Sequence, residues 1–258
     1  MLRARVADPF TTNKLEFTVI MNHLRSMIGI DDAMEGDFVR AKRRAQAEDV
    51  AQFVQQLQIS GERVLVIGDF NAFEFNDGYA DVMGTIAGLP APTNQVLLPS
   101  DDLVNPDLNN LIDTLPPTSR YSYVFDGTPQ AIDHALVTQN LLPRVNRFFY
   151  VRVNADSPEI FRNAADRPER VSDHDPALVY IRVGTMPRVA GLTRSASEVV
   201  VEGEGSPERQ YHIERSSDLI LWQQIGSAVP DGTQRFSFRD LNPVSGAAFY
   251  RLRAADQN

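Results

Sequence analysis

The sequence feature that most constrains the fold is a short apolar run that ends at an acidic residue. Residues 64–67 read VLVI, and Gly68 and Asp69 follow at once. An unbroken, mostly β-branched run of this length is typical of a strand that is covered on both faces. The carboxylate of Asp69 then lies at the end of a buried strand, which places a polar side chain at the rim of a layered sheet.

The segments before this run predict a second strand and a helix. In residues 15–23 the side chains alternate with period two, which gives the strand one apolar side. That side holds Leu15, Phe17, Val19, Met21 and His23. Residues 36–58 repeat apolar side chains at steps of three and four, as an amphipathic helix does, and the charges between them are interpreted as a solvated face. The apolar positions of this helix are Phe38, Ala41, Ala45, Val50, Val54 and Leu57.

The rest of the chain divides near residue 184. Before that point the sequence predicts a short helix at 77–87, a long loop at 88–118 and strands at 121–125, 131–137, 145–153 and 177–183. After residue 194, short β-type runs recur at regular spacing between turn-rich segments, which is the pattern of a small β-sandwich. We expect an α+β domain over 1–184, a linker over 185–194 and an all-β domain over 195–258, with Trp222 as a core anchor.

Composition and charge exclude several kinds of site. The chain has no cysteine, which excludes disulfides, thiolate metal sites and thiol nucleophiles. The net charge of −9 argues against broad, sequence-independent coating of nucleic acid, although acids clustered around a divalent cation also make the count negative. No apolar run is long enough to span a bilayer, and the start, MLRARVADPF, lacks the apolar core of a signal peptide.

Four short polar segments could carry chemistry. Three of them place a carboxylate at or beside a predicted strand end, and two of these add a histidine. Such residues suit metal-assisted phosphodiester cleavage, because carboxylates hold the cation and orient water, while a histidine can bond the phosphate and a second acid can fix its tautomer. The segments are Asn22-His23, Gly68-Asp69-Phe70-Asn71, Ile132-Asp133-His134 and Ser172-Asp173-His174-Asp175-Pro176.

Each segment also has a purely structural interpretation. A Gly-Asp pair after a strand is often a turn that bonds its own backbone. Asp133 lies in an apolar strand, where an unpaired carboxylate is costly, so it forms either a core ion pair or the support of a catalytic histidine. His134 points to the opposite face of that strand and is interpreted as structural. The SDHDP segment is equally compatible with a polar turn before a strand.

In combination these segments resemble the endonuclease/exonuclease/phosphatase superfamily, which includes deoxyribonuclease I. The likeness rests on VLVIGDFNAFEFNDGY, SRYSYVFDGTPQAIDHALV and SDHDPALVYI, in this order, with NHLRS upstream. It covers roughly residues 10–183 and is greatest to the secreted bacterial extracellular nucleases. It implies a two-layer β-sandwich with flanking helices, of the deoxyribonuclease I-like type, and a site at the end where both sheets meet.

The resemblance also implies a role for each matching residue. Asp69 would orient or activate the attacking water and face the metal, and Asn71 would donate to the scissile phosphate. Asp133 would support His174, while His174 would bond the phosphate and share the acid–base work. His23 would contact a further phosphate of the substrate.

Only the C-terminal half of the family's fold is matched. Asp173 would hold the divalent ion together with Asp69, and this ion is expected to be Mg²⁺, with Mn²⁺ or Ca²⁺ as alternatives. No residue matches the glutamate that is the principal Mg²⁺ ligand in the family's N-terminal half. We therefore expect a truncated sandwich or fragment whose exposed sheet face drives self-association or takes up a missing half, with weak Mg²⁺ binding and low activity of this chain.

Three functions are compatible with these features. The first is a divalent-metal-dependent phosphodiester hydrolase, an extracellular nuclease acting on DNA or RNA, which would be secreted or lie at the cell surface. The second is a phosphomonoesterase, or a phospholipid or phosphoinositide phosphatase, of the same superfamily. The third is a non-catalytic fragment or surface-binding module. In that case the C-terminal segment, which resembles small domains appended to secreted bacterial proteins, would be the working part.

Overall fold

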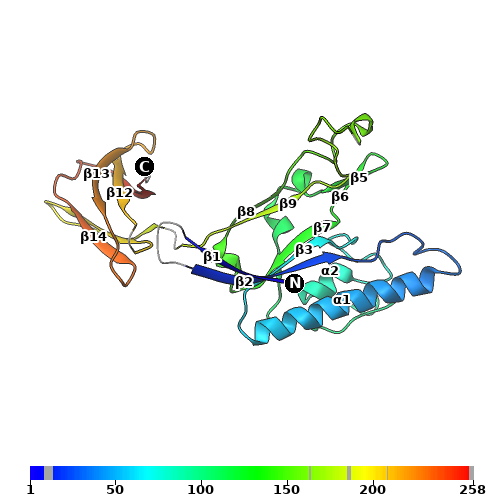
Figure 1. The fold of residues 1–258 in the computed structure, drawn as a ribbon. Coiled ribbons are helices and arrows are strands. Elements are labelled where there is room, and N and C mark those ends of the chain that lie inside the picture. Colours follow the sequence, from blue (N-terminus) through cyan, green and yellow to red (C-terminus); the bar gives the residue numbers. More distant parts are fainter. Residues whose placement is uncertain (9–13, 163, 185–186, 208, 256–258) are drawn as a thin grey trace. The chain divides into compact units, whose positions relative to one another are not determined.

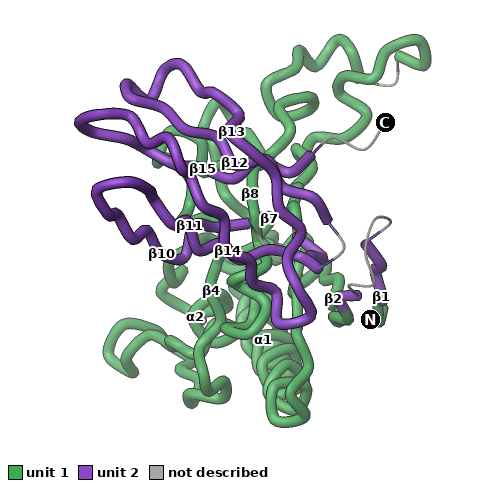
Figure 2. Tube along the Cα trace, turned by 90° about the vertical axis from the view of Figure 1, so that its left-hand side faces the viewer, with its two compact units in different colours: residues 1–4, 16–181 green, residues 5–15, 182–258 purple. Residues whose placement is uncertain are grey.

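The computed structural model describes residues 1–8, 14–162, 164–184, 187–207 and 209–255. The chain forms two compact units, of which the first comprises residues 1–4 and 16–181 and the second residues 5–15 and 182–258 (Figure 2). The α-helices belong to the first unit, and the C-terminal part of the second is built of strands (Figure 1). Among the described residues, no helix combines the length and the apolar character needed to traverse a bilayer.

The first unit is organised around a five-stranded sheet with the strand order β1-β2-β3-β7-β4. β2 and β3 run parallel and are joined by the helix α1, whereas β7 runs antiparallel to β3. The bounds are Leu2–Ala7 for β1, Lys14–His23 for β2, Gly36–Ile59 for α1, Val64–Asp69 for β3, Asn109–Asn110 for β4 and Asp133–Val137 for β7. Val64 and Val66 of β3 are fully buried, as the apolar run predicts for a central strand.

The helix α1 covers one face of this sheet with a stripe that matches the predicted one only in its C-terminal half. Val54 and Leu57 are buried and Val50 packs against the core as predicted, whereas Val39, Ala47 and Ala51 are buried in place of the predicted Phe38, Ala41 and Ala45, which are exposed. The true stripe contains Arg43, which is buried although it is charged. A prediction from hydropathy does not assign a charged residue to the core. The predicted buried face was therefore centred on apolar positions next to Arg43 and not on the face that contains it.

The buried side of β2 also differs from the prediction. Thr18 and Ile20 are buried and lie in register with Val64 and Val66 on the face that packs against α1. Met21, expected on the core side, is 77% exposed. Thr18 can be buried because its hydroxyl donates to the Glu62 carboxylate at 2.5 Å. The side chains of β2 therefore alternate between two faces as predicted, but the face with more apolar residues is the more exposed one, and the other face packs against α1.

The other elements of the first unit are short. The helix predicted at 77–87 is confined to α2, because the Asp81 side chain caps it by accepting from Gly84 N at 2.9 Å. The predicted loop at 88–118 contains β4 and two 3-10 turns. The remaining bounds are Val82–Ala87 for α2, Tyr123–Phe125 for β5, Thr128–Gln130 for β6, Val145–Tyr150 for β8 and Ala177–Ile181 for β9. The 3-10 turns are Leu111–Thr114, Pro117–Ser119, Leu142–Arg144 and Glu159–Phe161.

The C-terminal part of the second unit consists of two three-stranded antiparallel sheets, β10-β11-β14 and β13-β12-β15. Phe238 of one sheet lies so close to Gly226 of the other that an added Cβ would come within 2.3 Å of the ring. The predicted α+β architecture with an all-β C-terminal part is confirmed. The bounds are Arg188–Arg194 for β10, Val199–Glu204 for β11, Tyr211–Ser216 for β12, Gln223–Ala228 for β13, Arg235–Asp240 for β14 and Phe249–Ala254 for β15.

Two predictions for the second unit are wrong. The linker expected over 185–194 is a strand from Arg188 onward, paired with β11, while residues 185 and 186 lie outside the described residues. Trp222 is only half-buried, beneath the Arg251 guanidinium at 4.1 Å from the ring centroid. The core is anchored instead by Tyr211 and Ile213 of β12.

Candidate active site

Three strand ends bring His23, Asp69 and Asp133 into one row. His23 pairs with Asp69 across β2 and β3, and Asp69 pairs with Asp133 across β3 and β7. Residues directly opposite each other on paired strands project to the same side of the sheet. The row therefore lies at the rim of the sheet on the face opposite α1, and the His23 Nε2 is 3.5 Å from the Asp69 Oδ2.

A tight turn fixes the position of Asp69. Gly68 has φ +141, and a Cβ at this position would lie 2.0 Å from the Asn22 carbonyl oxygen, so only glycine fits between β2 and β3. The Asp69 carboxylate accepts hydrogen bonds from Asn71 N at 2.7 Å and Asn71 Nδ2 at 3.0 Å. The Gly-Asp pair therefore forms the turn that its structural interpretation predicts, and the same turn places Asp69 in the row.

Asn71 uses its amide group inside the protein. Its Nδ2 donates to the Leu24 carbonyl oxygen at 3.0 Å as well as to Asp69. Its φ of 48 is a left-handed conformation, which asparagine tolerates better than most residues. Both amide hydrogens are thus directed to protein acceptors, so in this geometry Asn71 orients Asp69 instead of offering a free N–H to a ligand.

His174 reaches the row from a separate segment and bonds Asp133. The His174 Nδ1 lies 2.7 Å from the Asp133 Oδ2, and the Ser122 hydroxyl donates to the same oxygen at 2.6 Å. The Tyr123 ring packs against the imidazole with centroids 4.7 Å apart. The hydrogen bond to the carboxylate and the packing of Tyr123 hold the ring in one orientation, as the side chain of a general acid or base requires.

Asp69, Asp133 and His174 form a charged cluster. One ligand atom of each lies within 4.8 Å of the others. Burial raises the pKa of Asp69, the Asn71 N–H opposes this shift, and the nearby Asp133 adds to it. The hydrogen bond to Asp133 raises the pKa of His174 against the opposing effect of its own burial. Two carboxylates at this distance repel each other, so a bound cation relieves an existing electrostatic cost.

The donor set of this cluster fits a divalent ion. Carboxylate oxygens suit Mg²⁺, Mn²⁺ and Ca²⁺, and Mg²⁺ keeps several waters when few protein ligands are available. Each carboxylate already accepts two hydrogen bonds, Asp69 at both of its oxygens from Asn71 and Asp133 at Oδ2 from His174 and Ser122, and the remaining lone pairs of both can face a cation. Asp173, the other predicted ligand, is not a member of the cluster and affects it through its charge, which raises the pKa of His174.

The two remaining predicted histidines have opposite environments. The side chain of His23 is 80% exposed beside Asp69. His134 is fully buried on the α1 side of the sheet, with Nδ1 3.1 Å from the Asn110 Nδ2 and Nε2 2.9 Å from the Ala72 carbonyl oxygen. Burial lowers the pKa of His134. The structure thus places His134 in the core, apart from the row.

One supporting residue that sequence analysis missed is Asp175. This residue is buried and its carboxylate accepts from the backbone N of Val153, Asn154 and Ala155 at 3.1, 2.8 and 3.0 Å. Arg152 donates to its other oxygen at 2.9 Å. These bonds hold the segment next to His174. The signal was available in the sequence SDHDP, but it did not reveal which of the two aspartates faces the protein.

A second supporting residue, Arg43, gave no signal at all. Its Nη1 donates to the carbonyl oxygens of Asn71 at 2.8 Å and Arg25 at 2.7 Å, and its Nη2 pairs with Asp77 at 3.0 Å. Arg43 therefore ties α1 to the turn that carries Asp69. In the sequence it is one of several basic residues in a helix, and only the tertiary structure distinguishes it from its exposed neighbours.

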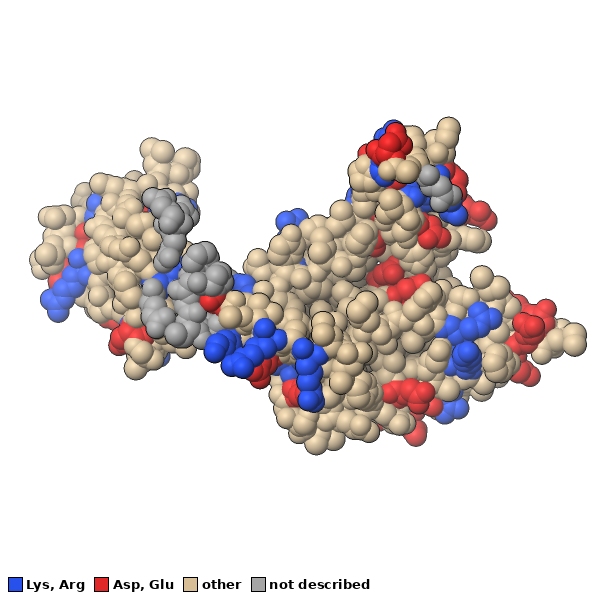
Figure 3. Space-filling view, in the orientation of Figure 1, with Lys and Arg blue, Asp and Glu red and all other residues tan. Residues whose placement is uncertain are grey.

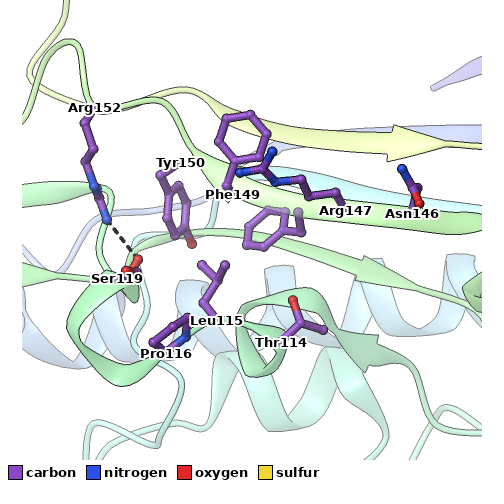
Figure 4. A pocket seen from close by; sticks show the side chains of 10 residues that line it. Thr114, Leu115, Pro116, Ser119, Asn146, Arg147, Phe149, Tyr150 and Arg152 are labelled. Carbon is purple, nitrogen blue, oxygen red and sulfur yellow. Dashed lines mark hydrogen bonds between the residues drawn. The ribbon is translucent and has the colours of Figure 1, made fainter. Parts of the chain in front are cut away.

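The first unit contains a cavity of about 560 Å³ (Figure 4). It runs along β8 and the segment 114–119, and it is lined by aromatic side chains together with Arg147 and Arg152. Its Tyr150 connects it to the row, because the Tyr150 hydroxyl donates to the Asp133 carbonyl oxygen at 2.5 Å. Figure 3 shows acidic side chains in a hollow of the first unit.

Comparison with known proteins identifies the family. A family model described as "Endonuclease/Exonuclease/phosphatase family" matches residues 13–174. Among solved structures, a 3′ phosphatase, NExo from Neisseria bound to a product DNA hairpin, is similar with 16% sequence identity and a TM-score of 0.38. That match covers 67% of this chain and 66% of the other, slightly less than two thirds of its length. No curated protein matches.

Proposed function

Since the chain belongs to the endonuclease/exonuclease/phosphatase family, we propose that it is a divalent-metal-dependent phosphodiesterase that cleaves nucleic acid. Members of this family are hydrolases of the phosphodiesterase and phosphatase type and generally depend on a divalent metal. The observation that carries the proposal is the 2.7 Å hydrogen bond between His174 and Asp133, formed beside Asp69. A histidine oriented by one carboxylate, next to a second carboxylate, suits proton transfer at a phosphate ester.

The residues of the row would share the chemistry as follows. Asp69, held by Asn71, orients the attacking water and accepts its proton. Asp133 keeps the His174 Nδ1 protonated, so the imidazole donates a hydrogen bond to the phosphate and takes part in proton transfer. His23, which is exposed next to Asp69, contacts a neighbouring phosphate of a polymer. A divalent ion held by Asp69, with Asp173 nearby, would supply positive charge against the charge that develops on the phosphate.

The cavity along β8 favours a polymeric substrate over a small phosphomonoester. Aromatic rings can stack with bases whatever their sequence, and arginine can pair with phosphate. Phe149 lines the cavity and stacks on Tyr180 at 5.9 Å, while the Arg147 guanidinium lies 4.5 Å above the Phe149 ring. We expect Phe149→Ala to raise KM for an oligonucleotide about tenfold, given roughly 1–3 kcal/mol for each base–aromatic stack, and to leave the hydrolysis of a soluble phosphomonoester unchanged. Equal effects on both substrates would favour the phosphatase alternative.

Substitution of His174 tests the proposal directly. Assays on DNA, RNA and a soluble phosphomonoester, each with Mg²⁺, should show that His174→Ala lowers kcat by about 10²–10⁴-fold. His212→Ala is the matched control, because His212 lies in β12 of the second unit and should leave turnover unchanged. If the two variants lose activity equally, or if Mg²⁺ has no effect on wild-type turnover, the proposal is wrong.

A further inference from the structure

The turn between β12 and β13 projects three consecutive aliphatic side chains from the second unit. Leu219, Ile220 and Leu221 are 56%, 80% and 77% exposed. The two strands are paired up to Arg215 and Gln223, so these three residues, here called the hairpin tip, close the hairpin. Three adjacent aliphatic residues left in water carry a hydrophobic cost, which indicates that something apolar covers them.

Hydrogen bonds inside the turn hold the hairpin tip in one conformation. Leu219 N donates to the Ser216 hydroxyl at 2.8 Å, and the N–H groups of Ile220 and Leu221 both donate to the Asp218 Oδ1, at 2.8 and 2.9 Å. Leu219 has φ +64, a left-handed conformation that is unfavourable for a residue with a side chain. The turn therefore maintains a strained backbone that keeps the aliphatic side chains outside.

The same hydrogen bonds specify the environment that the hairpin tip can enter. A backbone N–H that moves into lipid must already be bonded within the protein, because lipid offers no acceptor. All three N–H groups of the hairpin tip already have an acceptor, and residues 219–222 carry no charge. The acceptor of two of them is the exposed Asp218 carboxylate, which must stay in the headgroup region and so limits insertion to the aliphatic side chains. A protein partner that added a strand or a hydrogen-bonded loop would instead need free N–H groups.

Trp222 adds a second indication of a lipid environment. It follows the hairpin tip directly, is half-buried, and donates from Nε1 to the Leu219 carbonyl oxygen at 3.2 Å. The Arg251 guanidinium covers its ring at 4.1 Å. An indole with an apolar side and a polar, cation-covered side is the kind of group that collects at the boundary between hydrocarbon and water.

We propose that the hairpin tip inserts shallowly into a lipid surface and thereby attaches the second unit to it. The apolar side chains 219–221 enter the outer hydrocarbon region, and Trp222 stays at the level of the headgroups. The surface is zwitterionic, because residues 182–258 carry nine basic and nine acidic side chains and offer no net positive charge to anionic lipids. Attachment through three aliphatic side chains is reversible and little affected by salt, since apolar burial drives it.

Trp222 makes the proposal testable in the full-length chain, because it is the single tryptophan. Phosphatidylcholine vesicles should shift its fluorescence to shorter wavelength, and brominated phosphatidylcholine should quench it. The double variant Ile220→Ser/Leu221→Ser should weaken vesicle partitioning at least about tenfold, since two buried aliphatic side chains are lost. The matched control is Val229→Ser, which removes a 54% exposed aliphatic residue just beyond the other end of β13 and should bind like the wild type.

The outcomes distinguish lipid insertion from the pairing of two copies of the chain. Both sets of substitutions are at exposed positions, so unchanged far-UV circular dichroism and melting temperatures are expected. If wild-type Trp222 fluorescence does not respond to vesicles, or if the double variant partitions as the wild type does, the proposal is overturned. It is equally overturned if sedimentation finds a concentration-dependent dimer that the double variant abolishes while vesicles have no effect, because the hairpin tip would then pair with a second copy.

Discussion

Asp133 sets the protonation behaviour of His174, and this coupling can be measured at a single residue. The hydrogen bond that His174 donates to the carboxylate raises the pKa of His174, whereas burial alone would lower it. In Asp133→Asn we therefore expect the pKa of His174 to fall from above its ordinary value of about 6.5 to that value or below. Imidazole proton shifts in NMR titrations report this, and His212 in β12 of the second unit serves as the internal reference. An unchanged His174 pKa would show that the two side chains do not interact in solution.

The coupling between Asp133 and His174 also makes the unfolding free energy depend on pH. Because the pKa of His174 is higher in the folded chain than in the unfolded chain, the interaction stabilises the fold fully below about pH 6.5 and loses this effect as pH rises through the folded pKa. The difference in unfolding free energy between wild type and Asp133→Asn, measured by urea denaturation, should therefore be larger in mildly acidic than in alkaline buffer. A difference that grows with pH would contradict this assignment.

At the scale of the elements, the polar residues at the strand ends could be predicted from the sequence, but the residues that hold those strand ends in place could not. A strand repeats every two residues, so parity alone places Asp133 and His134 on opposite sides of their strand, whereas the register of β2, β3 and β7 is what brings His23 to the side of Asp133. Arg43 and Asp175 act through partners that are far away in the sequence, and no local pattern contains them. The buried face of β2 was missed for a similar reason, since the burial of Thr18 depends on its bond to Glu62.

Gly68 provides a test of how β2 and β3 are joined at the row. A methyl group at this position would meet the Asn22 backbone, at 2.0 Å from its oxygen, in addition to the strain of a φ of +141. Gly68→Ala should lower the unfolding free energy by more than the roughly 1–3 kcal/mol of backbone strain alone, as measured by urea denaturation. Gly61→Ala is the control, because its φ is +77 and nothing lies within 4 Å of the added Cβ. Equal losses in the two variants would mean that the close approach of Asn22 is unimportant.

At the scale of the whole molecule, exposed apolar side chains remain on two sheets of the first unit. Met21 of β2 and Leu178 and Tyr180 of β9 are exposed, although they belong to regular strands. Strand residues of this type are ordinarily covered by a second layer. The self-association expected from the sequence therefore remains a prediction, opposed by the net charge of −9.

The two units are expected to unfold separately, because each has its own core. In the first unit the core lies between α1 and the sheet, and in the second it is formed by Val201, Tyr211 and Ile213. Trp222 reports only on the second unit, whereas the far-UV circular dichroism of α1 reports on the first. Urea titrations should give different midpoints by the two probes, and Mg²⁺ should raise only the circular dichroism midpoint, because the proposed cation site lies in the row of the first unit. Coincident transitions, or a Trp222 midpoint that moves with Mg²⁺, would show that the units fold as one cooperative body.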